Sequence, residues 1–351
     1  MSFLPDREPN PWIAVNLSVL WPGMGQCYGN AWIKGLLLAS VTVGFLWYGT
    51  WSIFSAHGNT MTGLLVFATV GALYVMNVLD AYHTLKPLPK PSMSIYQPKR
   101  NRWYAVFLSQ ILPGFGHLYL QQAVVGGALL ASSTVTSLLA NEYPSLFPIP
   151  PFLWAIACYH IYRSTPYRGR THRWVIATII IGLLIIRLTV GYVPIWVNGT
   201  FMQFIVPSSS MVPTLQVNDR MFVRSQPLYK PQMGDVIVFH APDDAIAALD
   251  IDPNTIFVKR VIGLPGHRIA VAQGNVFVDD VPLVEPYISQ IPNYVWGPVT
   301  VPANAYVVLG DNRNESADSH IWGFLNVDDI VGKAYKIYWP PERIQPLTVS
   351  R

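Results

Sequence analysis

Residues 205–215 read IVPSSSMVPTL, and they stand at the point where the chain changes character. Long apolar runs precede this stretch, whereas short runs of alternating apolar and polar residues, separated by turn signals, follow it. Runs of about 20 apolar residues are typical of membrane helices, and alternation with a period of two is typical of half-buried strands. The sequence therefore predicts an α-helical transmembrane bundle followed by a mostly-β domain.

The composition supports membrane segments, and the charges are unevenly distributed. Hydrophobic residues make up 51% of the 351 residues and charged residues only 12%, far from the average soluble protein. Residues 1–195 carry twelve Lys and Arg against four Asp and Glu, whereas residues 196–351 carry eleven against fifteen. The basic residues lie in loops between apolar runs, so the net charge of +4 does not indicate a nucleic-acid partner.

Five apolar runs approach the length that spans a bilayer as helix, two of the middle ones being borderline. They lie near residues 33–54, 61–78, 123–140, 147–162 and 174–193. The loops at 86–102 and 163–173 contain five and four Lys or Arg and no acid. By the positive-inside rule these loops and the N-terminus are cytoplasmic, and the part after about residue 194 is extracytoplasmic. A multi-pass protein of a bacterial-type cytoplasmic (inner) membrane is expected.

The membrane part contains a repeat. PGMGQCYGNAWIKG begins at Pro22 and PGFGHLYLQQAVVGG at Pro113, an offset of 91 residues, and this opening resembles the TM2-type two-helix membrane module. We interpret its glycines as allowing a tight turn and close helix packing. The predicted division is a duplicated membrane region at 1–173 with repeat units at about 12–85 and 103–163, an anchor at 174–195, and a β-rich domain at 196–351.

The serines at 208–210 raise the question of whether one of them is a nucleophile. A serine hydroxyl needs a base to take its proton, usually histidine and sometimes lysine, and no later histidine lies in a recognisable triad setting. Lys259 lies in the apolar run TIFVKRVIGLPG, where strand alternation places it on one face with Phe257 and Val261. Burial there would lower its pKa and make it a base; a lysine reaching water from a strand edge is the alternative.

Four segments of the polar half together resemble the catalytic boxes of type I signal peptidases. They occur in the family's order and are PSSSMVPTL (207–215), GDVIVF (234–239), FVKRVIGLPG (257–266) and GDNRNESADSHIWG (310–323). The resemblance covers residues 204–340, and it implies a β-rich serine peptidase whose apolar face meets the membrane. It implies hydrolysis by a Ser-Lys dyad, with no metal and no cofactor.

The resemblance also implies a role for each matching residue. Ser210 matches the nucleophile, and Ser208 matches the serine whose hydroxyl joins the Ser210 N–H in the oxyanion hole. Lys259 matches the general base, and Ser316 matches the serine that hydrogen-bonds and orients this lysine. Donors aimed at a developing oxyanion are each worth roughly 10² to 10³ in rate, which gives a physical reason for the second hydroxyl.

Two acidic residues match positions that hold the site through ion pairs. Asp311 is expected to pair with Arg260, and Asp318 belongs to the same group. His320 stands where an arginine often partners the aspartate of the last box, so the partner of Asp318 is open. Apolar residues near the serine are expected to wall the substrate pockets: Phe204, Val206, Met211, Leu215 and Val258.

The predicted function is removal of signal peptides from exported preproteins through an acyl-enzyme. Small residues at the first and third positions before the cut are the expected preference. The expected partners are signal-bearing preproteins, the lipid bilayer and, as a further expectation, the secretion translocon, with no nucleic acid. Two alternatives stay open: a self-cleaving Ser-Lys repressor, disfavoured by the membrane bundle, and a catalytically inactive scaffold or transporter-like protein with a vestigial peptidase domain.

Overall fold

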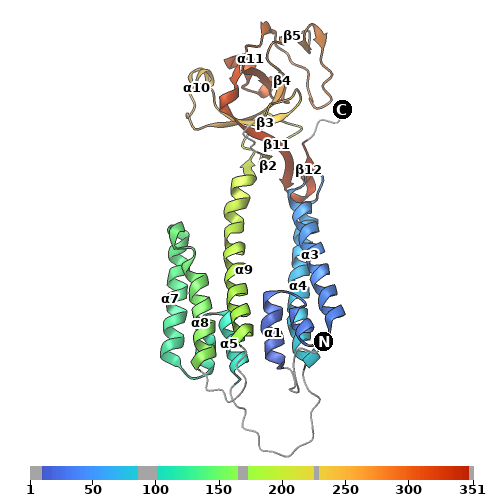
Figure 1. The fold of residues 1–351 in the computed structure, drawn as a ribbon. Coiled ribbons are helices and arrows are strands. Elements are labelled where there is room, and N and C mark those ends of the chain that lie inside the picture. The colour runs from blue at the N-terminus through green and yellow to red at the C-terminus, as the bar shows by residue number, and fades with distance from the viewer. Residues whose placement is uncertain (1–9, 86–100, 165–172, 225–228, 348–351) are drawn as a thin grey trace, which may run out of the picture. The chain divides into compact units, whose positions relative to one another are not determined.

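The computed structural model describes residues 10–85, 101–164, 173–224 and 229–347. The chain divides into two compact units. The first comprises residues 1–49 and 65–194 and is helical, and the second comprises residues 50–64 and 195–351 and is mostly β (Figure 1). The prediction of a helical membrane part followed by a mostly-β domain is confirmed.

The first unit contains two segments built from the same succession of elements. Each has a ten-residue helix, a five-residue helix and then two longer helices. In the first segment these are α1 (Pro11–Leu20), α2 (Met24–Tyr28), α3 (Trp32–Phe54) and α4 (Thr60–Leu85). In the second they are α5 (Arg102–Ile111), α6 (Phe115–Tyr119), α7 (Ala123–Glu142) and α8 (Ile149–Ser164), with the 3₁₀ turn η1 (Pro144–Leu146) before α8. The long helix α9 (Arg173–Thr200) follows.

The glycines of the repeated motif occupy positions that a side chain would not fit. Gly23 and Gly114 have φ of 93° and 98°, a left-handed conformation that L residues rarely adopt. A Cβ on Gly23 would lie 2.0 Å from the carbonyl oxygen of Gly35, and a Cβ on Gly114 would lie 2.2 Å from that of Gly126. These glycines therefore form the turn and let the third helix of each segment approach its backbone.

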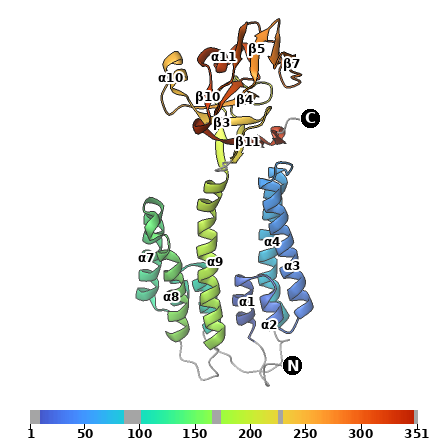
Figure 2. The same cartoon turned by 45° about the horizontal axis from the view of Figure 1, so that its top comes forward.

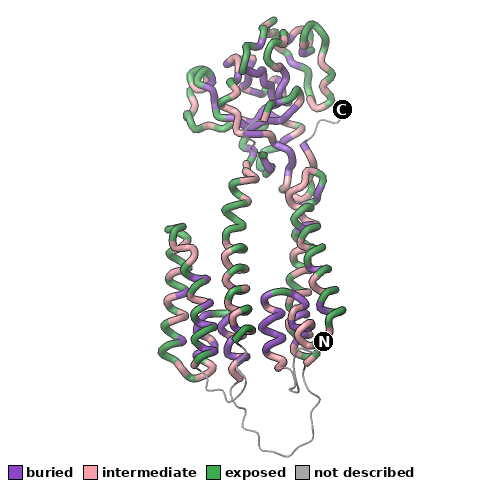
Figure 3. The backbone as a smooth tube through the Cα atoms, viewed as in Figure 1, coloured by how far each residue is buried: buried purple, intermediate pink, exposed green. Residues whose placement is uncertain are grey.

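Four helices in the described ranges are long and apolar enough to cross a membrane, namely α3, α4, α7 and α9. Only 11–17% of the residues in their most apolar windows are buried, and Figure 3 shows long exposed stretches along them. Apolar helices so little covered by protein need lipid around them. The expectation of five such spans is not met, because the helix at the fourth run, α8, is only 16 residues long.

The core of the first unit joins the two repeated segments and α9. Buried residues include Ile13 on α1, Trp103 on α5 and Ile179 on α9. The buried Asn16 side chain donates to the Trp103 carbonyl oxygen at 2.9 Å, which ties α1 to α5. Arg187 of α9 donates to a backbone carbonyl oxygen of α5 at 2.9 Å and stacks over the Trp154 ring at 3.6 Å. These contacts give the intramembrane arginine a backbone and an aromatic partner, while its buried Nε has no hydrogen-bond partner among the described residues.

The second unit consists of two antiparallel sheets. The larger has the strand order β1-β2-β11-β3-β4-β9-β10, with β12 paired to β11, and the smaller has the order β7-β6-β5-β8. Their bounds are β1 (Met202–Ile205), β2 (Arg220–Arg224), β3 (Val236–His240), β4 (Ile256–Gly263), β5 (Arg268–Ala272), β6 (Asn275–Val278), β7 (Val281–Pro282), β8 (Trp296–Thr300), β9 (Ala305–Leu309), β10 (Leu325–Asn326), β11 (Ile330–Trp339) and β12 (Gln345–Pro346).

Short helices close the ends of this domain. They are α10 (Asp243–Leu249), α11 (Ser319–Trp322) and the 3₁₀ turns η2 (Arg313–Glu315), η3 (Val327–Asp329) and η4 (Pro341–Arg343). Figure 2 shows β5 and β7 on the side of the domain away from α10. Separate apolar clusters cover the two faces of the central strands: Val258 of β4 belongs to one, and Phe257 and Val261 to another. The alternation expected for this strand is therefore present.

The second unit also includes the turn between α3 and α4. Lys336 of β11 is fully buried, and its ammonium group donates to the carbonyl oxygens of Ser52 and Ile53 at 3.1 and 2.8 Å. These carbonyls belong to the last turn of α3, where helix carbonyls have no helical partner and carry partial negative charge. The lysine thus satisfies this helix end.

Candidate active site

Ser210 lies in the turn that follows β1. Its side chain is buried, with 7% of the residue exposed, and its carbonyl oxygen accepts a hydrogen bond from the N–H of Asn312 at 3.1 Å. Two further backbone bonds close the turn, from Val212 N–H to the Ser209 carbonyl and from Leu215 N–H to the Met211 carbonyl. The backbone around the serine is therefore held from both sides.

Lys259 lies in the middle of β4 and reaches this serine. Only 3% of the lysine is exposed, and its Nζ lies 2.7 Å from the Ser210 Oγ as a hydrogen-bond donor. β4 pairs with β3 on one side and β9 on the other, so the lysine projects from a central strand rather than from an edge. Lys259 is therefore buried on a central strand and does not reach water from a strand edge.

Burial changes the acidity of this lysine. Loss of solvation lowers the pKa of Lys259 to about 8, against the partly compensating charges of Asp318 and Asp311, which raise it. A pKa near 8 leaves an appreciable fraction of the amine neutral at neutral pH. The neutral amine has a lone pair 2.7 Å from the serine oxygen, so the pair can exchange a proton directly.

Ser208 lies next to Ser210 and is exposed to solvent. Its Oγ is 3.2 Å from the Oγ of Ser210. A hydroxyl in this place could donate to an oxygen that becomes negative if the Ser210 oxygen attacked a carbonyl.

Ser316 lies close by, but the predicted hydrogen bond to Lys259 is not formed. The residue is 6% exposed, and its Oγ is buried and has no hydrogen-bond partner among the described residues. A Cβ on Gly310 would lie 2.1 Å from this Oγ and 2.5 Å from the Ser210 carbonyl oxygen, so the three residues are tightly packed. Ser316 therefore places an unsatisfied hydroxyl beside the backbone of Ser210.

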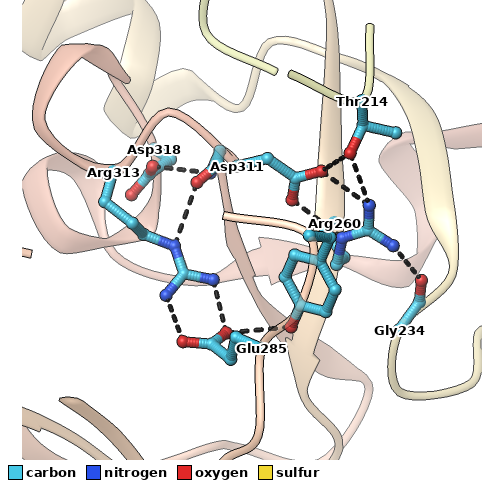
Figure 4. Close-up of polar contacts among 9 residues, drawn as sticks. Thr214, Gly234, Arg260, Glu285, Asp311, Arg313 and Asp318 are labelled. Atoms are coloured by element: carbon cyan, nitrogen blue, oxygen red, sulfur yellow. Dashed lines mark hydrogen bonds and ion pairs between the residues drawn. The ribbon is translucent and has the colours of Figure 1, made fainter. Parts of the chain in front are cut away.

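Arg260, the neighbour of Lys259 on β4, forms a buried ion pair with Asp311 (Figure 4). The Nε and Nη2 of Arg260 lie 2.8 and 2.6 Å from the two carboxylate oxygens of Asp311, with 3% and 0% of these side chains exposed. Arg260 also donates to the Gly234 carbonyl oxygen at 2.9 Å and to the Thr214 hydroxyl at 3.2 Å. The pairing of Arg260 on β4 with Leu309 on β9 brings Asp311 into reach.

The site contains a second buried ion pair, which the sequence did not predict. The guanidinium of Arg313 is fully buried and makes two hydrogen bonds to the carboxylate of Glu285, at 2.6 and 2.5 Å (Figure 4). Tyr287 donates its hydroxyl to the same carboxylate at 2.8 Å, and its ring lies under Arg260 at 3.9 Å. Arg313 lies in the segment GDNRNESADSHIWG (310–323), whereas nothing in the sequence around Glu285 indicates that it pairs with Arg313.

Asp318 finds its partners in the backbone and in His320. One carboxylate oxygen accepts from the Gly310 N–H at 2.8 Å, and the other lies 2.7 Å from the His320 Nδ1 and caps α11. The His320 ring stacks on Tyr294, with the ring centroids 4.2 Å apart. The histidine thus takes the place beside Asp318 that the sequence left open, and the fully buried carboxylate holds the loop that carries Gly310 and Asp311.

Four of the five expected pocket residues face the core instead. Val206, Met211, Leu215 and Val258 are 1%, 0%, 0% and 7% exposed and belong to one apolar cluster, so they have little surface to offer a substrate. Phe204 is partly exposed and packs against the same cluster. The turn around Ser210 directs its apolar side chains inward, which the sequence pattern did not show.

A metal site is not evident among the described residues, where no group of three or more His, Cys, Asp or Glu side chains could hold an ion. The local chemistry is instead that of a hydroxyl, an amine of lowered pKa and a neighbouring hydroxyl. This combination suits acyl transfer.

Comparison with known proteins gives a consistent result. Residues 172–339 match the family model described as signal peptidase, peptidase S26. The signal peptidase I of Leptolyngbya laminosa is 47% identical over 144 residues, which are 40% of this chain and 70% of that protein. Thylakoidal processing peptidase 1 of Arabidopsis thaliana is 36% identical over 143 residues, 40% of this chain and 42% of that protein.

A solved structure is also similar in sequence. The crystal structure of a signal peptidase I from Enterococcus faecalis V583 is 28% identical, covers 30% of this chain and 97% of its own, and superposes with a TM-score of 0.26.

Proposed function

The chain belongs to the signal peptidase I family, peptidase S26, and from this membership we propose that it cleaves signal peptides from exported preproteins with Ser210 and Lys259 as a catalytic dyad. The assignment of Ser210 and Lys259 as the dyad rests on the 2.7 Å distance between the Lys259 Nζ and the Ser210 Oγ. A vestigial domain would have no need to keep a buried lysine on a buried serine, so this contact favours an active enzyme over an inactive scaffold.

The proposed reaction begins with transfer of the Ser210 hydroxyl proton to neutral Lys259. The serine oxygen attacks the scissile carbonyl carbon, and the resulting oxyanion accepts hydrogen bonds from the Ser208 hydroxyl and the Ser210 N–H. The Lys259 ammonium then gives its proton to the leaving amine, which releases the mature N-terminus and leaves an ester on Ser210. Lys259 next takes a proton from water, the hydroxide adds to the ester carbonyl carbon, and the Lys259 ammonium returns the proton to the departing Ser210 oxygen.

Ser316 is proposed as a positioning residue for the lysine. Its hydroxyl is buried without a partner in the described residues, and an unsatisfied buried hydroxyl is unfavourable. When Lys259 becomes an ammonium it gains a donor, and a small side-chain movement would let the Ser316 oxygen accept it.

The pH dependence of the reaction follows from the lysine. The pKa of Lys259 is lowered to about 8, and only the neutral amine can accept the serine proton. We expect kcat/KM to rise about tenfold per pH unit below that pKa and to level off above it. A pH series at fixed preprotein concentration measures this. A profile that levels off near pH 6.5 would point to a histidine as the base instead.

Substitution of the second hydroxyl tests the oxyanion hole. Ser208→Ala is expected to lower kcat by roughly 10² to 10³ while KM changes little, because the donor acts on charge that exists only in the transition state. Steady-state cleavage by equal amounts of folded wild type and variant measures the two constants. As a control, Ser209→Ala should leave kcat within a few-fold. Equal rates for Ser208→Ala and wild type would remove the hydroxyl from the mechanism.

The proposed substrate preference is for small residues at the first and third positions before the cut. The test is cleavage of a purified signal-bearing preprotein by the detergent-solubilised full chain, with the product N-terminus identified by mass spectrometry. A single cut after a small residue is expected, and Leu at either position should slow it strongly. Cutting at equal rates with bulky and small residues would contradict the preference.

The family and the apolar helices make this a membrane protein. A cytoplasmic membrane with the catalytic domain outside remains our proposal, supported by the basic loops at 86–102 and 163–173. The similarity to a thylakoidal processing peptidase makes a thylakoid membrane the other candidate. The secretion translocon remains a proposed partner.

A further inference from the structure

The first unit contains a large cavity lined only by its own residues. It has a volume of about 1040 Å³ and is walled by α5, α8 and α9. Ligand cavities typically measure roughly 300–1,000 Å³, so this one could hold a large molecule. We call it the arginine-rimmed cavity after the residues Arg102, Arg163 and Arg173 in its wall.

Each of the three arginines lies at an end of its helix. Arg102 and Arg173 are the first residues of α5 and α9, and Arg163 lies in the last turn of α8. His160 adds a further nitrogen-bearing ring, and within the described residues the wall contains no aspartate or glutamate. The starts of two helices add partial positive charge there, and Arg163 in the last turn of α8 offsets the partial negative charge of that helix end. This end of the cavity therefore favours an anion.

The rest of the wall is apolar and continues along the same helices. It includes Phe152 and Ile156 on α8 and Ile176, Ile180 and Ile181 on α9. At a rise of about 1.5 Å per residue, Ile181 lies roughly 12 Å along α9 from Arg173, and Phe152 lies roughly 16 Å along α8 from Arg163. Phe152, Ile156 and Ile181 are 48%, 54% and 57% exposed, so the apolar part is open at its side.

A charged rim over an apolar wall matches an amphiphile with an anionic head. A gap between membrane helices would fill with lipid chains in any case, but Arg163 and Arg173, in a wall whose described residues include no aspartate or glutamate, favour an anionic headgroup. The basic n-region of a signal peptide would be repelled by the same charges, which argues against the substrate as occupant. We propose that the arginine-rimmed cavity binds an anionic phospholipid, with the phosphate at Arg163 and Arg173 and the acyl chains along the apolar wall.

The test is native mass spectrometry of the purified full chain after incubation with equal amounts of phosphatidylglycerol and phosphatidylcholine in detergent. Preferential retention of phosphatidylglycerol is expected. Arg163→Gln/Arg173→Gln should weaken it roughly thirtyfold, since each basic residue near an anionic headgroup contributes about one kcal/mol to lipid binding. Ala177→Phe, which fills the apolar wall and keeps every charge, should also reduce retention.

The matched control removes the same charge elsewhere. Lys34→Gln/Arg220→Gln changes two exposed basic residues outside the cavity and should retain phosphatidylglycerol like wild type. Glycerol 3-phosphate in excess, a head without chains, should not displace the lipid. Far-UV circular dichroism checks that each variant is folded.

Four outcomes would overturn the proposal. Equal retention of both lipids by wild type would remove the headgroup preference. Equal loss in the cavity and control variants, or no effect of Ala177→Phe, would show a diffuse attraction to surface charge. Displacement by glycerol 3-phosphate would show an anion site that does not need acyl chains. None of these readouts depends on peptidase activity, so they are independent of the proposed function.

Discussion

Lys259→Met is expected to abolish preprotein cleavage while leaving the protein folded. Methionine has a similar length and suits a buried strand position, but it has no lone pair of comparable basicity for the Ser210 proton 2.7 Å away. Removing the base of a nucleophile–base pair costs roughly 10⁶ in kcat in a serine peptidase that works as a unit. Cleavage by equal concentrations of wild type and variant, followed by gel and mass spectrometry, measures the loss.

The stability of this variant separates a catalytic from a structural loss. In wild type the folded pKa of Lys259 is about 8, below the ordinary value of 10.5, so the unfolded chain binds more protons between these pH values. Wild-type stability contributed by this group therefore rises with pH through that window and is lowest below pH 8. The methionine variant should be at least as stable as wild type at pH 7, with the difference narrowing toward pH 10.5.

Two comparisons make the result decisive. Ser210→Ala should be equally inactive, and Lys259→Met/Ser210→Ala should be no worse than either single variant, because the two side chains act as one unit. Appreciable cleavage by Lys259→Met at neutral pH would show that another group removes the serine proton.

Asp311→Ala is expected to unfold or severely destabilise the peptidase domain. It leaves Arg260, which is 3% exposed, without its carboxylate, and removing one partner of a buried pair typically costs about 3–5 kcal/mol. That is a large share of the total stability of an ordinary domain, roughly 5–15 kcal/mol. Because Lys259 is the neighbour of Arg260 on β4, activity should fall together with stability.

The matched control for this prediction is an exposed pair in the same unit. Arg268 and Asp280 lie 2.8 Å apart, but their side chains are 50% and 76% exposed. Exposed pairs contribute about 0–1 kcal/mol, so Arg268→Ala should change the unfolding midpoint little. Denaturant unfolding followed by the far-UV signal measures both variants. A loss for Asp311→Ala no larger than that for Arg268→Ala would contradict the role assigned to the buried pair.

The apolar runs predicted which parts of the chain form long membrane helices, but not where each helix ends. The apolar runs marked the helices α3, α4, α7 and α9, because hydrophobicity over a window needs no tertiary contact. The run at 147–162 folds as only 16 residues of helix, after a 3₁₀ turn at Pro144–Leu146. Helix ends depend on local turns and prolines that an average over the window hides.

The site shows the same division. The boxes marked Ser210 and Lys259, but their contact joins residues 49 positions apart, and strand order is what brings them together. The Glu285 partner of Arg313 could not be found, because ion pairing across 28 residues depends on the fold and leaves no local signal. Met211 and Leu215 were expected in a pocket and lie in the core, because a turn, unlike a strand, has no fixed alternation.

The sequence by itself determined the class of the protein: a membrane-helical part with two like segments, a β-rich domain, and a short set of candidate residues for acyl transfer. These properties are encoded locally, in hydrophobic period, turn chemistry and motif. Only the tertiary structure decided that Lys259 is buried, that His320 stands beside Asp318, and that three arginines meet around one cavity. Burial and pairing are properties of what surrounds a side chain, and residues distant in the chain supply those surroundings.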